Sequence, residues 1–265
     1  MTTNRQIAVD RTIDAGCYAR EQIHSRDRLI AWSHRRRFST ALMLGRQFAD
    51  RRLLDYGCGD GTFLGLLMSG SARPSAAMGA EIDQEMVDDL RSRFADYTGL
   101  NFTRTDELSR PEETHRYDGI FCMEVLEHVV DWHPLLEEFE RLLKPGGRLV
   151  VITPIEIGLP LLVKQAVRRV AGWRGIGHYP GTTGYTALEL GKSVLASSTQ
   201  HIERPIFTRQ DGSLFYDHKG FNWKVLKVAL AKRFNIVRTL TSPIGWLGPQ
   251  ASTQVWFIAQ KESAR

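Results

Sequence analysis

Leu53-Leu54-Asp55-Tyr56-Gly57-Cys58-Gly59-Asp60-Gly61 is the stretch of sequence that decides the fold of this chain. Residues 52–56 are predicted to form a short strand, and the alternating glycines are predicted to form a tight turn that opens a helix over 62–69. Glycine lets the backbone turn sharply and approach a ligand closely. The free N–H groups at the start of the helix can receive a carboxylate or a phosphate. The Gly-x-Gly-x-Gly spacing differs from the Gly-x-Gly-x-x-Gly fingerprint of dinucleotide-binding proteins, and Asp55 suits a ligand with a cationic amino group better than a pyrophosphate.

Downstream of this turn, short apolar runs alternate with amphipathic segments of helical period. The predicted strands are 76–82, 100–104, 117–123, 148–153, 235–240 and 254–260, and the predicted helices are 84–97, 133–143 and 220–234. Alternation at this spacing predicts βαβ units with right-handed crossovers, hence a three-layer α/β fold with a doubly wound, mostly parallel sheet. Ligands of such sheets lie at the carboxyl ends of the strands.

Two segments depart from this alternation. Apolar residues recur at helical spacing over 28–49, which predicts an N-terminal helical cap at 1–49 before a main domain at 50–265. The glycine-rich range 154–218 is predicted to be an insertion that serves as a substrate lid. Within it, 159–171 reads as a basic amphipathic helix, which either covers the substrate as part of the lid or makes a peripheral membrane contact.

The composition limits the function classes. The chain has 265 residues, 42% hydrophobic residues and a formal net charge of +5, so it is an ordinary globular chain with a mild basic excess. Three cysteines without a Cys-x-x-Cys motif argue against a disulfide framework or a zinc site, and a cytoplasmic location is expected. The run 33–38 is the densest basic stretch, and one short run on a helix is typical of a solvated face, so no nucleic-acid partner is predicted. No oligomeric state is predicted.

Acidic residues follow the second and third predicted strands. Glu81 ends the second strand, where a carboxylate can accept both hydroxyls of a ribose, whereas Asp83 is expected to cap the following helix. Asp106 ends the third strand and can accept a hydrogen bond from an adenine amino group; the alternative for Asp106 is a solvated loop residue.

The ordered set of motifs resembles that of class I S-adenosylmethionine-dependent methyltransferases over about residues 50–154. The motifs that carry the resemblance are Leu53–Gly61, Gly79–Asp83, Asp106, Tyr117–His128 and Leu143–Pro154. The resemblance implies a seven-stranded sheet whose last strand is antiparallel, with S-adenosylmethionine as the cofactor. It places Gly57 and Gly59 at the methionine part of the cofactor, Glu81 at the ribose and Asp106 at the adenine. The predicted cofactor-binding residues are Asp55, Gly57, Gly59, Glu81, Ile82, Asp106, Met123 and Glu124.

The run Cys122–Val129 is the candidate for acceptor chemistry. A base is needed only if the nucleophile must lose a proton, as a hydroxyl does, and His128 is the predicted catalytic base. If the run is helical, Glu124, Glu127 and His128 share one face and could hold a divalent cation. The run resembles that of the ubiquinone-biosynthesis O-methyltransferases, in which Glu-x-x-Glu-His occurs and a magnesium role is associated with it. No metal is nevertheless predicted, and these three residues are the candidate ligands if one is used.

The predicted activity is that of a class I methyltransferase that moves a methyl group to a small-molecule acceptor, most readily at a hydroxyl oxygen. Transfer to nitrogen or carbon, or to a glycan or lipid precursor, stays open. A non-catalytic cofactor-binding or membrane-associated accessory protein is the alternative from another class. The insertion adds weight to an apolar or lipid-like acceptor and to a peripheral membrane location. Further pocket candidates are Tyr18, one arginine of the cap, His178, Tyr179, Tyr185, His201 and His218.

Overall fold

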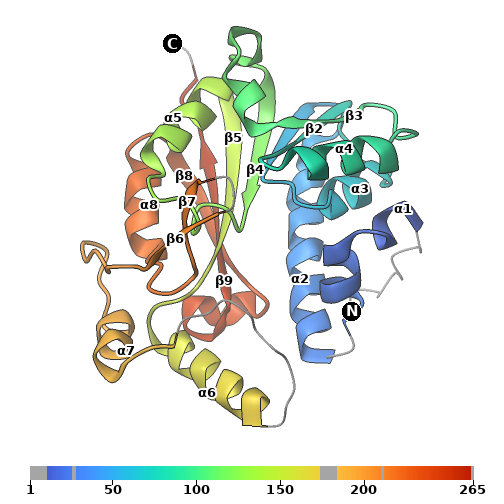
Figure 1. Cartoon of the computed structure of the whole chain (residues 1–265). Coiled ribbons are helices and arrows are strands. Elements are labelled where there is room, and N and C mark those ends of the chain that lie inside the picture. The colour runs from blue at the N-terminus through green and yellow to red at the C-terminus, as the bar shows by residue number, and fades with distance from the viewer. Residues whose placement is uncertain (1–10, 26–27, 174–183, 210–211, 264–265) are drawn as a thin grey trace. The chain divides into compact units, whose positions relative to one another are not determined.

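A computed structural model describes residues 11–25, 28–173, 184–209 and 212–263 of the chain (Figure 1). The chain divides into two compact units, 1–109 and 110–265. The predicted cap, 1–49, falls within the first unit and the predicted lid, 154–218, within the second. Both of these assignments stay predictions.

The first unit combines helices with three parallel strands. Its helices are α1 (Arg11–Asp14), η1 (Ala19–Ile23), α2 (Arg28–Gly45), η2 (Arg46–Phe48), α3 (Thr62–Met68), α4 (Gln84–Arg93) and η3 (Thr105–Ser109), and its strands are β1 (Arg52–Tyr56), β2 (Ala76–Glu81) and β3 (Leu100–Arg104). β2 pairs in parallel with β1 on one side and with β3 on the other. α4 packs on β2 and β3, and α2 contacts α3.

Local chemistry explains the bounds of β2 and α4. Gly79 faces Phe102, and a Cβ at position 79 would lie 2.6 Å from that ring and 2.9 Å from the Cys58 sulfur, so only glycine fits this close packing. Asp83 caps α4 as predicted, because its carboxylate accepts from the backbone N–H of Glu85 at 2.8 Å. The helix ends at Arg93 rather than at residue 97, because the next residue, Phe94, turns into the core and is 2% exposed.

The second unit contains the remaining strands and the insertion. Its helices are η4 (Pro111–Glu113), α5 (His133–Leu142), α6 (Leu159–Trp173), α7 (Ala187–Val194), α8 (Trp223–Ala231) and η5 (Gly245–Ala251), and its strands are β4 (Tyr117–Met123), β5 (Leu143–Pro154), β6 (Ile206–Thr208), β7 (Leu214–Tyr216), β8 (Asn235–Ser242) and β9 (Gln254–Gln260). β4 and β5 are parallel, and β9 is antiparallel to both β5 and β8. α5 packs on β5, and α8 packs on β8 and β9 (Figure 1).

The main sheet has seven strands in the order β3-β2-β1-β4-β5-β9-β8. This order, with helices flanking a mostly parallel sheet, confirms the predicted doubly wound α/β fold, and the antiparallel last strand confirms what the resemblance implied. β5 begins at Leu143 rather than at residue 148, because Leu143 already pairs with Tyr117 of β4; the pairing is then interrupted, with Gly146 at a φ of 76°, until Arg148 pairs with Gly119. The buried core of the sheet includes Leu53, Leu54, Ile120, Val151 and Phe257, each 0% exposed.

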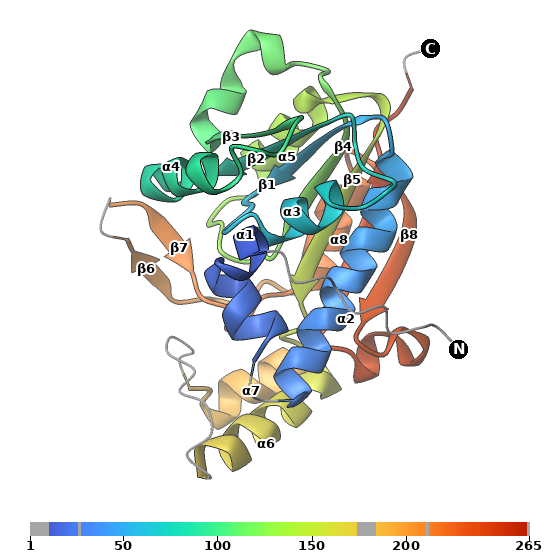
Figure 2. The ribbon, with the colours of Figure 1, turned by 90° about the vertical axis from the view of Figure 1, so that its right-hand side faces the viewer.

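The described residues of the insertion form the helices α6 and α7 and the strands β6 and β7. α6 follows β5 directly and contacts α7 and η5. The two-stranded antiparallel sheet of β6 and β7 was not anticipated, because strands of three residues are too short for a periodic pattern. Figure 2 shows this hairpin standing apart from β8. Within the described ranges, no helix has the length and hydropathy needed to cross a bilayer.

Candidate functional site

The glycine turn after β1 has the backbone conformation for which glycine is needed. Gly57, Gly59 and Gly61 have φ values of 70°, 54° and 75°, in the left-handed region that other residues enter at a cost. The N–H groups of Gly57 and Cys58 both donate to the Ala80 carbonyl, at 2.8 and 3.1 Å. These bonds hold the turn against the carboxyl end of β2.

Glu81 lies at that end of β2, beside the turn. Its carboxylate accepts from the backbone N–H of Gly59 at 2.9 Å and from that of Ile82 at 2.8 Å. Two backbone donors hold the carboxylate in place, with lone pairs left for a ligand. Ile82 is 43% exposed next to it. Two of the predicted cofactor residues, Gly59 and Glu81, are thus in direct contact.

Asp55 is fully buried at the end of β1, and neither of its carboxylate oxygens has a hydrogen-bond partner among the described residues. Burial, and next the charge of Glu81, raise the pKa of Asp55 well above its ordinary value. An uncompensated buried acid of this kind is costly unless a cation or a donor reaches it. The carboxylates of Asp55 and Glu81 are therefore hydrogen-bond acceptors that fit a ligand with both a cationic amino group and hydroxyls.

Tyr18 covers the same turn from the N-terminal segment. Its backbone N–H donates to Asp60 at 2.7 Å, and a Cβ at Gly59 would lie 2.8 Å from the Tyr18 ring. Burial raises the pKa of the Tyr18 phenol, and the charge of buried Arg37 opposes that shift. Sequence reasoning named Tyr18 and an arginine of the cap only as candidates, because nothing local in a helical segment indicates which loop it will contact.

Asp106 lies in η3 and forms an ion pair with Arg104, with 3.0 Å between Nε and Oδ1. Its side chain is 65% exposed. Neither observation distinguishes an adenine acceptor from a solvated loop acid, so the assignment of Asp106 to the adenine stays a prediction.

The run after β4 is not helical, so the condition under which Glu124, Glu127 and His128 would share one helical face is not met. The chain leaves β4 through Glu124, whose φ is 56°, and then forms a tight turn rather than a helix. The Glu124 carboxylate accepts from the Gln254 amide at 2.7 Å. A left-handed residue does not continue a right-handed helix. The hydrogen bond to Gln254 holds the Glu124 side chain against β9. Met123 and Glu124 stay predictions as cofactor contacts.

His128 is held by the hairpin of the insertion. Its Nδ1 lies 2.8 Å from the Tyr216 carbonyl oxygen, and the Tyr216 N–H donates back to the His128 carbonyl at 3.0 Å. Because a carbonyl can only accept, Nδ1 carries the proton and Nε2 keeps a free lone pair. Burial lowers the pKa of His128, so the ring is neutral near neutral pH.

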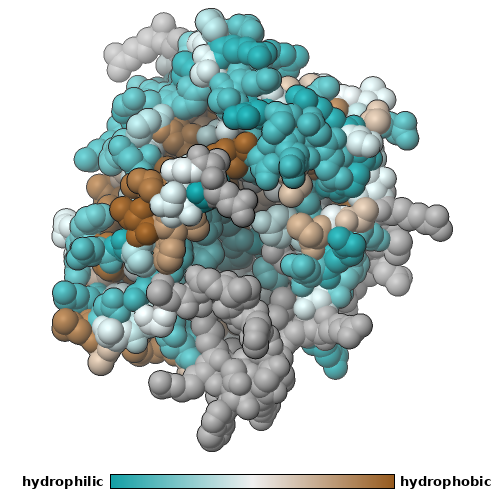
Figure 3. Space-filling model, viewed as in Figure 1, coloured by the Kyte–Doolittle hydropathy of each residue, from teal (hydrophilic) through white to brown (hydrophobic). Residues whose placement is uncertain are grey.

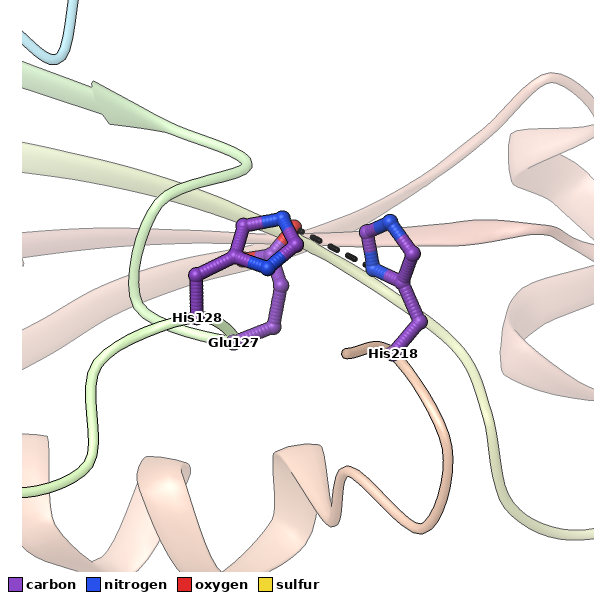
Figure 4. Close-up of side chains that lie close together, drawn as sticks. All are labelled: Glu127, His128 and His218. Atoms are coloured by element: carbon purple, nitrogen blue, oxygen red, sulfur yellow. Dashed lines mark ion pairs between the residues drawn. The ribbon is translucent and has the colours of Figure 1, made fainter. Parts of the chain in front are cut away.

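His218 completes a cluster that the sequence did not indicate. The rings of His128 and His218 meet edge to face with centroids 4.6 Å apart, and His218 Nδ1 lies 3.9 Å from a carboxylate oxygen of Glu127 (Figure 4). Glu127 is 0% exposed. His128 and the Tyr216 that holds it are 88 positions apart in the chain, so no local pattern links the two segments.

One potential metal-binding atom each from Glu127, His128 and His218 lies within 4.8 Å of the other two. A carboxylate with two imidazoles is a donor set that suits divalent transition metals. The candidate metal ligands in the structure are therefore Glu127, His128 and His218, whereas the sequence analysis named Glu124 in place of His218. The prediction that no metal is used stays a prediction.

The structure describes two of the other four pocket candidates of the insertion, Tyr185 and His201. The Tyr185 hydroxyl accepts from the Gly220 N–H at 3.0 Å, and His201 is exposed. His178 and Tyr179 lie outside the described residues. In α6, Leu161 is buried, whereas Leu159, Leu162 and Val163 are exposed. The exposed apolar side chains of α6 are compatible with a substrate lid and with a membrane contact, so both alternatives stay predictions.

A sheet of this strand order, with a glycine turn after its first strand and a carboxylate at the end of its second, defines a Rossmann-like, class I methyltransferase fold. Residues 24–191 match the methyltransferase domain family, which is more than half of the chain. The chain belongs to this family, and its cofactor is S-adenosylmethionine.

Similar proteins agree with this assignment. A ubiquinone biosynthesis O-methyltransferase of Xanthomonas oryzae is 34% identical over 138 residues, which cover 49% of this chain and 56% of that protein. The chain thus spans about half the length of such relatives. Among solved structures, an S-adenosylmethionine-dependent methyltransferase from Mesorhizobium loti has a TM-score of 0.53 at 14% identity, with 85% of this chain and 98% of that chain covered. A geranyl diphosphate C-methyltransferase from Streptomyces coelicolor has a TM-score of 0.53 at 17% identity, with 90% and 81% covered.

Proposed function

We propose that the chain transfers a methyl group from S-adenosylmethionine to a hydroxyl oxygen of a small molecule, with His128 as the base. S-adenosylmethionine supplies the methyl group as an activated sulfonium. The task left to the protein is to align the acceptor, exclude water and take the hydroxyl proton. His128 Nε2 accepts that proton, so the imidazole becomes a cation for the duration of the step.

The observation that carries this proposal is the hydrogen bond from His128 Nδ1 to the Tyr216 carbonyl. The bond leaves Nε2 as the acceptor and orients the ring, which is what a general base needs. The lowered pKa of His128 keeps the base unprotonated at neutral pH. The O-methyltransferase relative supports an oxygen acceptor, and that support extends to 49% of this chain.

In the first unit, we assign the cofactor to the turn after β1. Glu81 takes the ribose hydroxyls, because its carboxylate is held beside the turn by Gly59 and Ile82. The unpartnered Asp55 oxygens accept from the amino group of the cofactor.

An apolar acceptor is favoured by the surface of the insertion. Exposed apolar side chains lie on the β6–β7 hairpin, at Ile206, Phe207 and Leu214, and on α8, at Val228. Figure 3 shows hydrophobic residues gathered over α8 and this hairpin. Because β7 also carries Tyr216, which holds His128, an apolar molecule seated on the hairpin lies next to the base.

The experiment is a methyl-transfer screen across phenols, sugars and lipid precursors, with the product analysed by mass spectrometry. With an accepted phenol, His128→Gln is expected to lower kcat by roughly 10²–10⁴-fold without changing cofactor affinity. His133→Gln is the matched control, because His133 is exposed. In the wild type, kcat/KM is expected to fall with acid only below the ordinary histidine pKa. Unchanged turnover in the His128 variant, or a methylated nitrogen or carbon, contradicts the proposal.

A chelator distinguishes two roles for the same side chains, His128 as a general base and the Glu127–His128–His218 cluster as a metal site. Activity is expected to persist in EDTA. If EDTA abolishes turnover and a divalent cation restores it in the wild type but not in His218→Ala, the cluster binds a metal and His128 is not the base.

A further inference from the structure

Arg204 lies at the junction of the two segments that form the Glu127–His128–His218 cluster. It belongs to the irregular stretch before β6, and its guanidinium donates to the backbone carbonyls of Glu127 and Asp217, both through Nη2. Its Nε donates to the Lys219 carbonyl at 3.1 Å. One side chain thus joins the turn after β4 to the loop after β7.

Aromatic rings hold the guanidinium in this place. Its carbon lies 4.2 Å from the centroid of the Tyr216 ring and 5.3 Å from that of Phe221. A cation over an aromatic face is attracted by the ring quadrupole, more strongly when it is desolvated. Gly220 has a φ of 73°, and a Cβ there would lie 3.4 Å from Arg204 Cγ, so the loop approaches the stem of the arginine closely.

The charge on Arg204 is retained despite this burial. Desolvation lowers the pKa of Arg204 to about 10, and the charges of Asp217 and Glu127 are among those that oppose the shift. The group is therefore a cation at neutral pH. Three backbone carbonyls, two aromatic rings and the nearby acidic groups together offset the cost of burying this cation.

We infer that Arg204 is the positioning residue of the acceptor site: by clamping the loop 216–219 to the turn 127–128, it sets the tautomer of His128 and the place of His218. The inference rests on the proposed function only for its effect on turnover. Arg204 contacts Tyr216 and its neighbours, and Tyr216 contacts His128 through both of its backbone groups. Arg204 therefore acts through Tyr216 and not on the acceptor itself.

Lysine is the informative replacement. It keeps the positive charge, but a single ammonium lacks the planar fork that reaches three carbonyls of different residues. Arg204→Lys should therefore loosen the loop while leaving the charge of the site unchanged. Arg209→Lys is the matched control, because Arg209 also stacks on a ring of the hairpin, Phe215, at 5.2 Å.

The readout is the tautomer of His128, measured by long-range proton–nitrogen NMR on protein with labelled histidines. The wild type and Arg209→Lys are expected to show neutral His128 protonated on Nδ1. Arg204→Lys is expected to show a mixture with the Nε2-protonated form, and a kcat lowered about ten- to a hundredfold with unchanged affinity for S-adenosylmethionine. A purely structural role would lower the melting temperature without changing the tautomer.

The outcomes separate this inference from the proposed function. An unchanged tautomer in folded Arg204→Lys overturns the inference. A changed tautomer with unchanged turnover supports the role of Arg204 and contradicts His128 as the base. If Arg204→Lys does not fold, hydrogen exchange in the wild type decides: the Arg204 Nε–H and the Tyr216 amide should both exchange slowly, and fast exchange of either overturns the inference.

Discussion

Gly59 shows how much a single residue contributes to the cofactor turn. Its φ of 54°, the bond from its N–H to Glu81 and the Tyr18 ring beside it all depend on the missing side chain. Asp55 makes the complementary point, because burial without a partner disfavours its charged form, which a cationic group of a ligand would stabilise. At this scale, the predicted cofactor residues Asp55, Gly59 and Glu81 belong to the first unit, and the proposed base, His128, belongs to the second.

Gly59→Ala is therefore expected to weaken cofactor binding by at least about tenfold, because alanine in the left-handed region costs roughly 1–2 kcal/mol and its Cβ would clash with Tyr18. Isothermal titration calorimetry with S-adenosylmethionine measures this. Gly191→Ala, at a helical position with open space around it, is the control. Wild-type affinity in Gly59→Ala would show that the glycine turn after β1 does not bind the cofactor.

Among the elements, α4 depends on its cap as much as on its apolar face. Asp83 accepts from the N–H groups of Glu85 and Met86, at 2.8 and 3.3 Å, and so satisfies donors that the helix itself leaves free. Val87 and Leu90 of α4 are fully buried. The start of this helix directly follows Glu81 and Ile82, so the cap also fixes where the predicted ribose contacts lie.

Asp83→Ala is expected to lower the free energy of unfolding by about 1 kcal/mol, whereas Asp83→Asn should cost only a few tenths, because asparagine is an equally good cap. Urea denaturation followed by circular dichroism measures both variants. Equal losses in the two variants would mean that the charge of Asp83, and not its cap, stabilises the helix.

For the molecule as a whole, we expect the stability in acid to depend on the half-buried His34. Burial, and next the charge of Arg37, lower the pKa of His34 to about 4 from a usual value of 6.5. Between these two pH values the unfolded chain binds a proton at this site that the folded chain does not. Stability therefore rises with pH from about 4 to 6.5 and is insensitive to this group above 6.5.

His34→Gln is expected to flatten this part of the stability profile, measured as the urea midpoint at pH values from 4 to 7. Leu188→Gln is the control, because Leu188 is 71% exposed and has no titratable group, so this variant should keep the wild-type slope. A His34→Gln profile as steep as that of the wild type would contradict the assignment.

Most of the fold could be predicted because its signals are local. Alternating apolar runs, the glycine turn and the cap at Asp83 are short-range features, and they yielded the strands, their mostly parallel order and the position of Glu81. The three-residue strands β6 and β7 were missed, because they are shorter than any periodic pattern. Whether the run after β4 is helical could not be decided from the sequence, because Glu124 adopts a left-handed conformation that no glycine or asparagine at this position signals.

The sequence by itself determined the class of fold, the family and the glycine turn with Glu81, since each of these depends on residues close together in the chain. Only the tertiary structure decided that His128 is held by Tyr216, that His218 and not Glu124 lies beside it, and that Arg204 joins the two segments. Those contacts bridge residues far apart in the sequence, through backbone carbonyls that every residue possesses. No residue pattern marks which carbonyl a distant arginine or histidine will bind, so this part of the site exists only once the chain has folded.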